Sequence, residues 1–190
     1  MVIYGLDRDG NRIHETTGGR KMKLLIHDLN NTQLQCISPE ALKDAYIISD
    51  TGTIQHCIGC FGCWIKTPGK CVLKDGYDNM GELLSKSAGV TIISRCFYGC
   101  YSPFVKNVLD RSIPWLLPFF KTINRETHHK RRYQNSFQLT VHFYGEKITK
   151  EERETAQNLV KANCTNFYVK KYEISFSNSL EELCRKVVTI

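Results

Sequence analysis

Five segments of the chain have the hydrophobic patterns of β-strands. Residues 23–27, 46–49 and 90–94 are short apolar runs rich in β-branched residues, which is typical of strands buried on both faces. Residues 137–144 and, more loosely, 172–177 alternate between apolar and polar positions. We therefore predict five strands.

Helical signals lie between these strands. Ser-Pro pairs supply an N-cap and a proline at the first helical position for helices over 38–45 and 102–113. Residues 78–88 carry apolar side chains at helical spacing, and a Thr-x-x-Glu capping box opens a helix over about 149–162. Strands that alternate with helices predict an α/β fold, a mainly parallel sheet covered by helices on both faces.

Length and composition favour one globular domain. The chain has 190 residues, of which 42% are hydrophobic and 24% charged, so a disordered, collagen-like or coiled-coil protein is excluded. The longest apolar run, residues 113–120, is far shorter than the roughly 20 residues of a membrane helix. We divide the chain into an extension over 1–20, which forms either a small hairpin or a tail, and a domain over 21–190.

The net charge of +7 would suit an anionic partner, but its distribution argues against one. More than half of it falls in residues 121–132. No pattern of stacking aromatic residues accompanies this segment, so we interpret it as a solvated connection between a helix and a strand. We predict no nucleic-acid partner; a nucleic-acid-binding arm is the alternative.

The loops at the carboxyl ends of the strands are the expected ligand site of such a sheet. They cover residues 29–32, 95–101 and 145–147, and the middle one carries Phe97, Tyr98 and Gly99. Its aromatic side chains would stack on a planar ring, and the glycine would allow a close backbone approach. A turn whose aromatic side chains cover the end of the sheet is the alternative.

Nine cysteines make the sharpest chemical signal. The start of the chain has no secretory signal, so we expect a cytoplasmic protein whose thiols serve a metal or redox role rather than disulfide bridges. Cys57, Cys60, Cys63 and Cys71 follow a C-x2-C-x2-C-x7-C spacing, which suits a four-cysteine iron–sulfur cluster. A zinc ion and a metal-free loop of packed thiols are the alternatives.

Together these features resemble the flavodoxin-like NAD(P)H-dependent FMN reductases, and most of all their iron–sulfur flavoprotein branch. The similarity rests on residues 57–75 (CIGCFGCWIKTPGKCVLKD), the third strand, the Phe97-Tyr98-Gly99 loop and residues 104–111 (FVKNVLDR), and it covers about 22–177. It implies a five-stranded sheet in the order 2-1-3-4-5, FMN at the strand ends, a homodimer or homotetramer, and a [4Fe-4S] cluster on the four spaced cysteines.

The resemblance also assigns residues to the flavin. It places the FMN phosphate on Asn30, Asn31 and Thr32, although the loop after the first strand reads Asp-Leu-Asn-Asn-Thr and the helix that follows is shortened. The isoalloxazine ring would lie on residues near the ends of the third and fourth strands: Arg95, Cys96, Phe97, Tyr98, Gly99, Tyr144 and Gly145. In this chain Arg95-Cys96-Phe97 replaces the family's Pro-Val-Tyr.

The function implied is an oxidoreductase that passes electrons from NAD(P)H through FMN to a small-molecule or protein acceptor, with the cluster as a further carrier. The shortened first helix motivates an alternative: a non-enzymatic electron carrier or metal-binding protein that kept the scaffold and lost efficient FMN binding.

Overall fold

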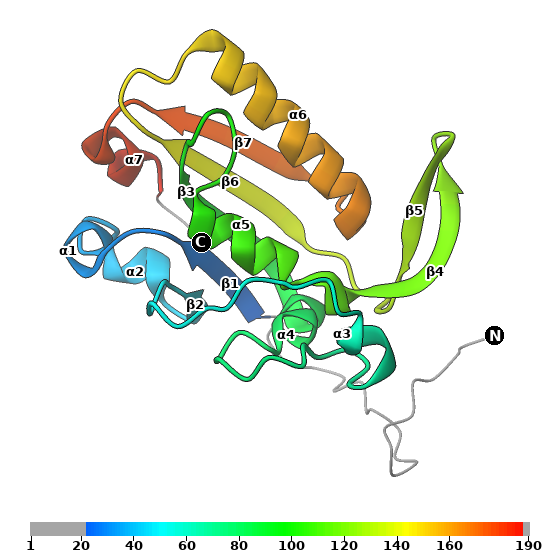
Figure 1. The fold of residues 1–190 in the computed structure, drawn as a ribbon. Coiled ribbons are helices and arrows are strands. Elements are labelled where there is room, and N and C mark those ends of the chain that lie inside the picture. Colours follow the sequence, from blue (N-terminus) through cyan, green and yellow to red (C-terminus); the bar gives the residue numbers. More distant parts are fainter. Residues whose placement is uncertain (1–21, 188–190) are drawn as a thin grey trace.

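A computed structural model describes residues 22–187, so the predicted N-terminal hairpin or tail lies outside the described residues. A five-stranded parallel sheet forms the centre of the molecule (Figure 1). Its strands are β1 (Met22–His27), β2 (Ala45–Ile48), β3 (Ser87–Arg95), β6 (Gln138–Tyr144) and β7 (Tyr172–Ser177). They are hydrogen-bonded in the order β2-β1-β3-β6-β7, so the predicted order 2-1-3-4-5 is confirmed.

Burial explains the apolar runs of the inner strands. Leu24 and Ile26 of β1 pack in one hydrophobic core, whereas Leu25 packs in a second core on the opposite face. Successive side chains of a strand point to opposite faces, so a strand covered on both sides must be apolar at every position. This is the pattern that predicted β1 and β3.

Helices cover both faces, as expected (Figure 1). The larger core lies under α4 (Met80–Lys86), α5 (Pro103–Asp110) and α6 (Lys150–Phe167). The smaller core lies under α1 (Asn31–Leu34), α2 (Pro39–Leu42) and α7 (Leu180–Lys186). The predicted capping box is present at the start of α6, where Thr149 and Glu152 bond each other's backbone amides.

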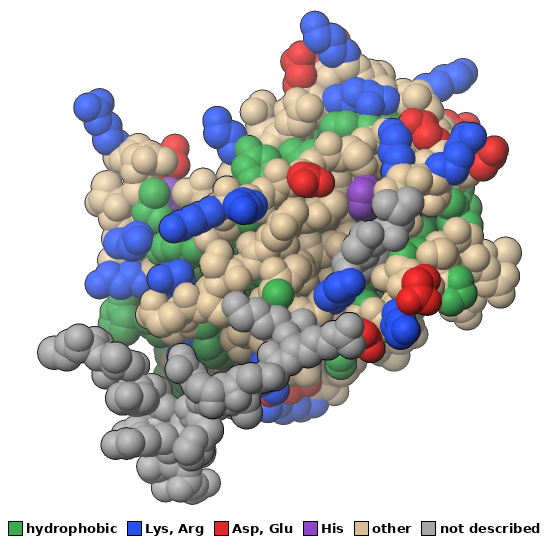
Figure 2. Space-filling view, turned by 180° about the vertical axis from the view of Figure 1, so that it is seen from behind, with side chains coloured by type: hydrophobic (Ala, Val, Ile, Leu, Met, Phe, Trp, Pro, Cys, Tyr) green, Lys and Arg blue, Asp and Glu red, His purple; other side chains and the backbone are tan. Residues whose placement is uncertain are grey.

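Residues 116–131 correct one prediction. They form an antiparallel hairpin of β4 (Leu116–Ile123) and β5 (Glu126–Arg131), preceded by the short helix η1 (Ile113–Trp115), rather than a solvated connection. The hairpin projects beyond the sheet and is held to the end of α6, where the Tyr168 hydroxyl donates to the His129 carbonyl at 2.8 Å (Figure 1). Figure 2 shows Lys and Arg side chains spread over this face of the molecule, with few acidic side chains among them on the side that carries the hairpin.

Two of these basic side chains already have a partner. Lys121 and Arg131 lie 4.7 and 5.7 Å from the centre of the Tyr168 ring, within the range of cation–π contacts. Part of the concentrated charge therefore anchors the hairpin. Within residues 22–187, no helix has both the length and the apolar character that crossing a membrane requires.

Candidate cysteine centre and strand-end cleft

The predicted metal ligands lie in a long connection between β2 and α4, on a short helix and its flanks. The helix α3 (Gly62–Ile65) begins after Phe61, whose φ of 54° is left-handed. At Gly62 a side chain has no space, because a Cβ there would lie 2.5 Å from Cγ1 of Val72. This contact lets the chain return beside the helix and bring Cys71 back toward the first three cysteines.

All four predicted cysteines line one cavity of about 380 Å³. Cys57 and Cys60 are exposed, Cys63 is half-buried and Cys71 is buried. No three His, Cys, Asp or Glu side chains in the described ranges converge closely enough to hold a single ion, so the thiols surround the cavity without meeting at one point. The structure thus gathers the four predicted ligands at one place.

The thiols influence one another. Burial, together with the neighbouring Cys71, Cys57 and Cys60, raises the pKa of Cys63 to about 11. A cation among them would relieve this effect, because metal ligation replaces the thiol protons. The donor set therefore fits a soft metal centre, which thiolates prefer.

Arg111 and Asp75 form a buried ion pair at the base of this loop. The guanidinium donates to both carboxylate oxygens of Asp75, at 2.7 and 2.9 Å, and the two side chains are 0% and 3% exposed. These hydrogen bonds hold the pKa of Asp75 at about 2, against an ordinary 3.8. The spacing of the cysteines gave no sign of this pair, whose members are 36 residues apart.

Aromatic side chains form the wall of the cysteine cavity toward the hairpin. Trp64 stacks on Phe61, with ring centres 5.4 Å apart, and lies 4.8 Å from the ring of His129. The His129 ring lies 4.6 Å from Phe120, which is exposed. Nδ1 of His129 lies 2.8 Å from the carbonyl oxygen of Leu117; since a carbonyl only accepts, Nδ1 carries a proton. The sequence interpretation missed His129, because the hairpin that positions it was not predicted.

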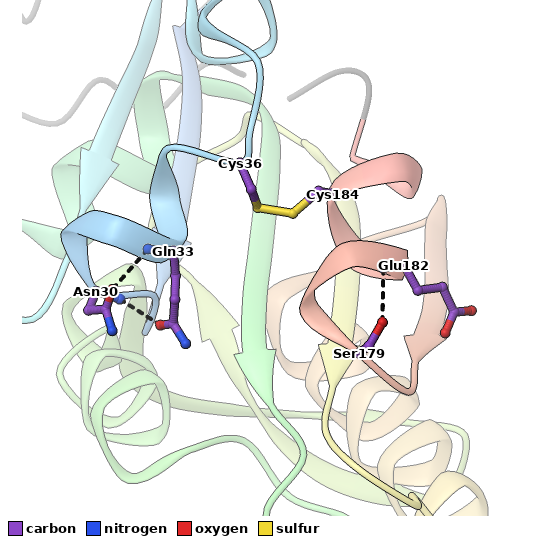
Figure 3. Close-up of a disulfide and its surroundings, with 6 residues drawn as sticks. All are labelled: Asn30, Gln33, Cys36, Ser179, Glu182 and Cys184. Carbon is purple, nitrogen blue, oxygen red and sulfur yellow. Dashed lines mark hydrogen bonds between the residues drawn. A yellow bond between two sulfur atoms is a disulfide. The ribbon is translucent and has the colours of Figure 1, made fainter.

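The predicted phosphate residues lie at the start of α1, which has only four residues, so the predicted shortening is confirmed. Asn30 is the N-cap: its side chain accepts from the Gln33 amide at 2.8 Å, and its own amide donates to the Gln33 side chain at 2.9 Å (Figure 3). Asn30 is therefore occupied with its own helix. Within residues 22–187, the exposed side chains of Asn31 and Thr32 have no hydrogen-bond partner.

The loop after β3 turns back on itself and packs against α6. Phe97 and Cys100 exchange both backbone hydrogen bonds at 2.9 Å, which makes Tyr98 and Gly99 the tip of a tight turn. A Cβ on Gly99 would lie 2.7 Å from Cβ of Thr155, so this glycine allows close approach to α6. The aromatic side chains of Phe97 and Tyr98 point away from the core and are exposed.

Asp28 links two of the predicted ligand loops. Its carboxylate accepts from the Arg95 amide at 2.8 Å and from the Tyr144 hydroxyl at 3.1 Å. Burial and the Asp28 carboxylate raise the pKa of Tyr144, which therefore stays protonated. Burial also raises the pKa of the Cys96 thiol.

Most backbone donors expected to hold the flavin ring are already used. Besides the Arg95 amide, the Cys96 amide donates to the Tyr144 carbonyl, and the Gly145 amide donates to the Ser177 carbonyl. A cleft of about 330 Å³ remains at the strand ends, lined by Gln33, Arg95, Tyr144, Gly145, Glu146 and residues 178–180. It shares no lining residue with the cysteine cavity.

A disulfide connects two walls of this cleft. Cys36, just after α1, is bonded to Cys184 of α7 (Figure 3). The Cα atoms lie 5.6 Å apart, within the usual range for a bridge. The expectation that the cysteines form no bridges is therefore wrong for this pair, which the fold brings together across 148 residues.

Comparisons with known proteins agree with the fold. No family model matches the sequence. An iron–sulfur flavoprotein of Methanocaldococcus jannaschii is 29% identical over 86 residues, which cover 45% of this chain. The matched part spans only 44% of that relative's own length. The similarity is to the branch that the cysteine spacing and the FVKNVLDR segment indicated.

Two solved structures share the architecture. The NAD(P)H:quinone oxidoreductase of Methanothermobacter marburgensis has a TM-score of 0.54 at 13% identity, with 89% of this chain and 96% of that chain covered. An FMN-dependent NADH-azoreductase of Bacillus anthracis, in complex with FMN, has a TM-score of 0.50 at 9% identity, with 89% and 92% covered. These likenesses confirm the flavodoxin-like fold.

Proposed function

We propose that this chain is a flavin-dependent oxidoreductase that passes electrons from NAD(P)H to a small-molecule or protein acceptor, with a [4Fe-4S] cluster on Cys57, Cys60, Cys63 and Cys71. The observation that carries the proposal is the gathering of these four thiols around one 380 Å³ cavity on a fold shared with NAD(P)H-dependent flavin enzymes. We further propose that it works in the cytoplasm as a homodimer or homotetramer.

The cysteine cavity suits a cluster better than one zinc ion. A [4Fe-4S] cluster holds four ligand sulfurs apart around its cube, whereas a zinc ion draws all four to about 2.3 Å from one point. Four thiols around a cavity of about 380 Å³ leave room for the larger group, which supports the first arrangement. A bound cluster would supply one-electron transfer, and the cysteines would hold it.

FMN would be held at the strand ends. Asn31 and Thr32 have exposed side chains for the phosphate, Arg95 lines the cleft, and exposed Phe97 and Tyr98 would cover the ring. Bound FMN would supply the exchange between two-electron donors and one-electron carriers. Half-buried Tyr144 would keep its proton there, because partial burial and the Asp28 carboxylate raise its pKa.

A second candidate is an electron-transfer or metal-binding protein without functional FMN. The internal hydrogen bonds of Arg95, Cys96 and Gly145 favour it, because a flavin ring would have to compete for these amides. The carboxylate of Asp28 beside the phosphate loop favours it too, since it would repel a phosphate.

One experiment separates the two candidates. Purified protein is titrated with FMN by fluorescence quenching, and NAD(P)H oxidation is followed with a quinone or a ferric acceptor. The proposed enzyme binds FMN stoichiometrically and oxidises NAD(P)H steadily. Absence of both, in protein that holds iron, would establish the second candidate and reject the first.

A further inference from the structure

One buried side chain holds both ends of the cysteine loop. Nη1 of Arg111 donates to the carbonyl of Gln55 at 2.7 Å, two residues before the first cysteine of the set. Nη2 lies 3.4 Å from the carbonyl of Leu73, two residues after the last one. Arg111 itself follows α5, so the loop is closed onto a helix that is packed in the main core.

Asp75 fixes the guanidinium in this position. Its carboxylate accepts from the amides of Gln55 and Tyr77, at 2.8 and 3.1 Å, in addition to its two bonds with Arg111. A buried charge is tolerated when it is paired and hydrogen-bonded, as both members are here. The pair therefore forms a rigid base under the loop.

The guanidinium retains one donor that is not used. Its Nε is buried and has no hydrogen-bond partner within residues 22–187. The carbonyl that Nη2 approaches at 3.4 Å belongs to Leu73, two residues from buried Cys71, so the guanidinium holds the segment that carries this cysteine. A sulfur that carries negative charge would complete the bonding of this arginine.

We propose that Arg111 is a positioning residue of the cysteine centre: it closes the loop before the metal binds and supports Cys71 as a ligand. The inference rests on the proposed cluster. Hydrogen bonds and charge at the ligand sulfurs help to set the reduction potential of iron–sulfur clusters, so Arg111 also raises that potential.

The test compares Arg111→Lys with the wild type and with Arg185→Lys. The lysine variant keeps the charge but loses the planar fork and Nε. Arg185 is an exposed arginine of α7, paired only at the surface with Glu181, so it is a matched control. All three proteins are reconstituted anaerobically with iron and sulfide, and iron content and the cluster midpoint potential are measured.

The metal-free proteins are treated with a thiol-alkylating reagent, and labelling of Cys71 is followed by mass spectrometry. We expect Arg111→Lys to label Cys71 at least tenfold faster, to retain less than half the iron, and to shift the midpoint potential downward. Arg185→Lys matches the wild type in all three measurements.

The outcomes distinguish the two proposals. A wild type that takes up no iron overturns the proposed cluster, and the role of Arg111 with it. A wild type with iron, alongside Arg111→Lys with unchanged potential and unchanged Cys71 labelling, overturns only the role of Arg111. If Arg111→Lys does not fold, Asp75→Asn replaces it, because this variant removes the charged partner that fixes the guanidinium. A wild-type midpoint potential and wild-type Cys71 labelling in Asp75→Asn would also overturn the inference.

Discussion

The cysteine cavity and the strand-end cleft share no lining residue, and they differ in how their polar groups are used. At the cysteine cavity four thiols line the wall, one of which, Cys60, accepts a hydrogen bond from the Gly62 amide, and within residues 22–187 the buried Nε of Arg111 lacks a hydrogen-bond partner. Near the strand-end cleft, the side chains of Asp28 and Asn30 accept hydrogen bonds from backbone amides, and other amides there donate to carbonyls. At the first site polar groups remain available for a bound group, whereas at the second many of them already bond to other parts of the chain.

The two regions are also held together differently. A buried ion pair closes the cysteine loop, and a disulfide joins the walls of the strand-end cleft. The ion pair and the disulfide can be removed by separate substitutions, so each region can be perturbed while the other serves as its control.

The largest expected effect is loss of the metal centre from ligand variants. Cys63→Ser should lose nearly all iron after anaerobic reconstitution, because its hydroxyl replaces a thiolate that cluster iron prefers. Cys164→Ala, at a buried cysteine of α6 in the main core, should keep wild-type iron. Equal iron in the two variants would show that the thiols around the cavity do not act as a ligand set.

The next largest effect is the loss of folding stability when the buried ion pair is broken. Asp75→Asn should lower the free energy of unfolding by about 3–5 kcal/mol, because it leaves the buried Arg111 charge without its partner. Urea unfolding monitored by circular dichroism measures this. The half-buried Asp78, paired with exposed Lys74, gives a control: Asp78→Asn should cost no more than about 1 kcal/mol. A loss below about 1 kcal/mol for Asp75→Asn would contradict the account.

The same pair makes the free energy of unfolding depend on pH. The Asp75 pKa is lowered from 3.8 to about 2 in the folded protein, so its contribution is complete above about pH 4 and is lost as the pH falls toward 2. Asp75→Asn should therefore unfold with less change in stability between pH 4 and 2 than the wild type. An equal change in stability between pH 4 and 2 in the two proteins would contradict the lowered pKa of Asp75.

The disulfide should contribute somewhat less than the ion pair. The double variant Cys36→Ser/Cys184→Ser should lose about 2–4 kcal/mol, because the bridge restricts the unfolded chain. Wild type treated with a dithiol reductant should unfold like the variant, while its iron uptake stays unchanged. Two free thiols at these positions in untreated protein, found by mass spectrometry, would contradict the bridge.

The smallest effect concerns Asp28. Asp28→Asn should bind FMN about fivefold more tightly, equivalent to about 1 kcal/mol, since it removes a negative charge near the phosphate loop. Glu173→Gln, a charge-matched change in β7, should have no effect. Weaker FMN binding by Asp28→Asn would show that the carboxylate supports the flavin site.

Local signals predicted most of the fold. Apolar runs predicted three strands of the sheet, alternating patterns predicted the other two, and Thr149 with Glu152 predicted the start of α6, because all of these signals depend on neighbours in the sequence. The hairpin was missed, because the apolar run over 113–120 that overlaps β4 contains two prolines and because β5 is mostly polar and exposed, without a strand pattern.

The candidate site was predictable only in part. The spacing of the four cysteines brought them to one cavity, because a single short segment carries them all. Arg111, Asp75 and His129 were not predicted as members, since their contacts join segments far apart in the sequence. The Cys36–Cys184 bridge escaped prediction for the same reason.

The central claim is that the four thiols hold an iron–sulfur cluster, and one measurement tests it most directly. Wild-type protein is reconstituted anaerobically with iron and sulfide, desalted, and analysed for iron, zinc, sulfide and flavin on one sample, with its absorption spectrum. We predict about four iron and four sulfide per chain and a broad absorption band that dithionite bleaches. Stoichiometric zinc without sulfide, or protein without metal, would contradict the claim.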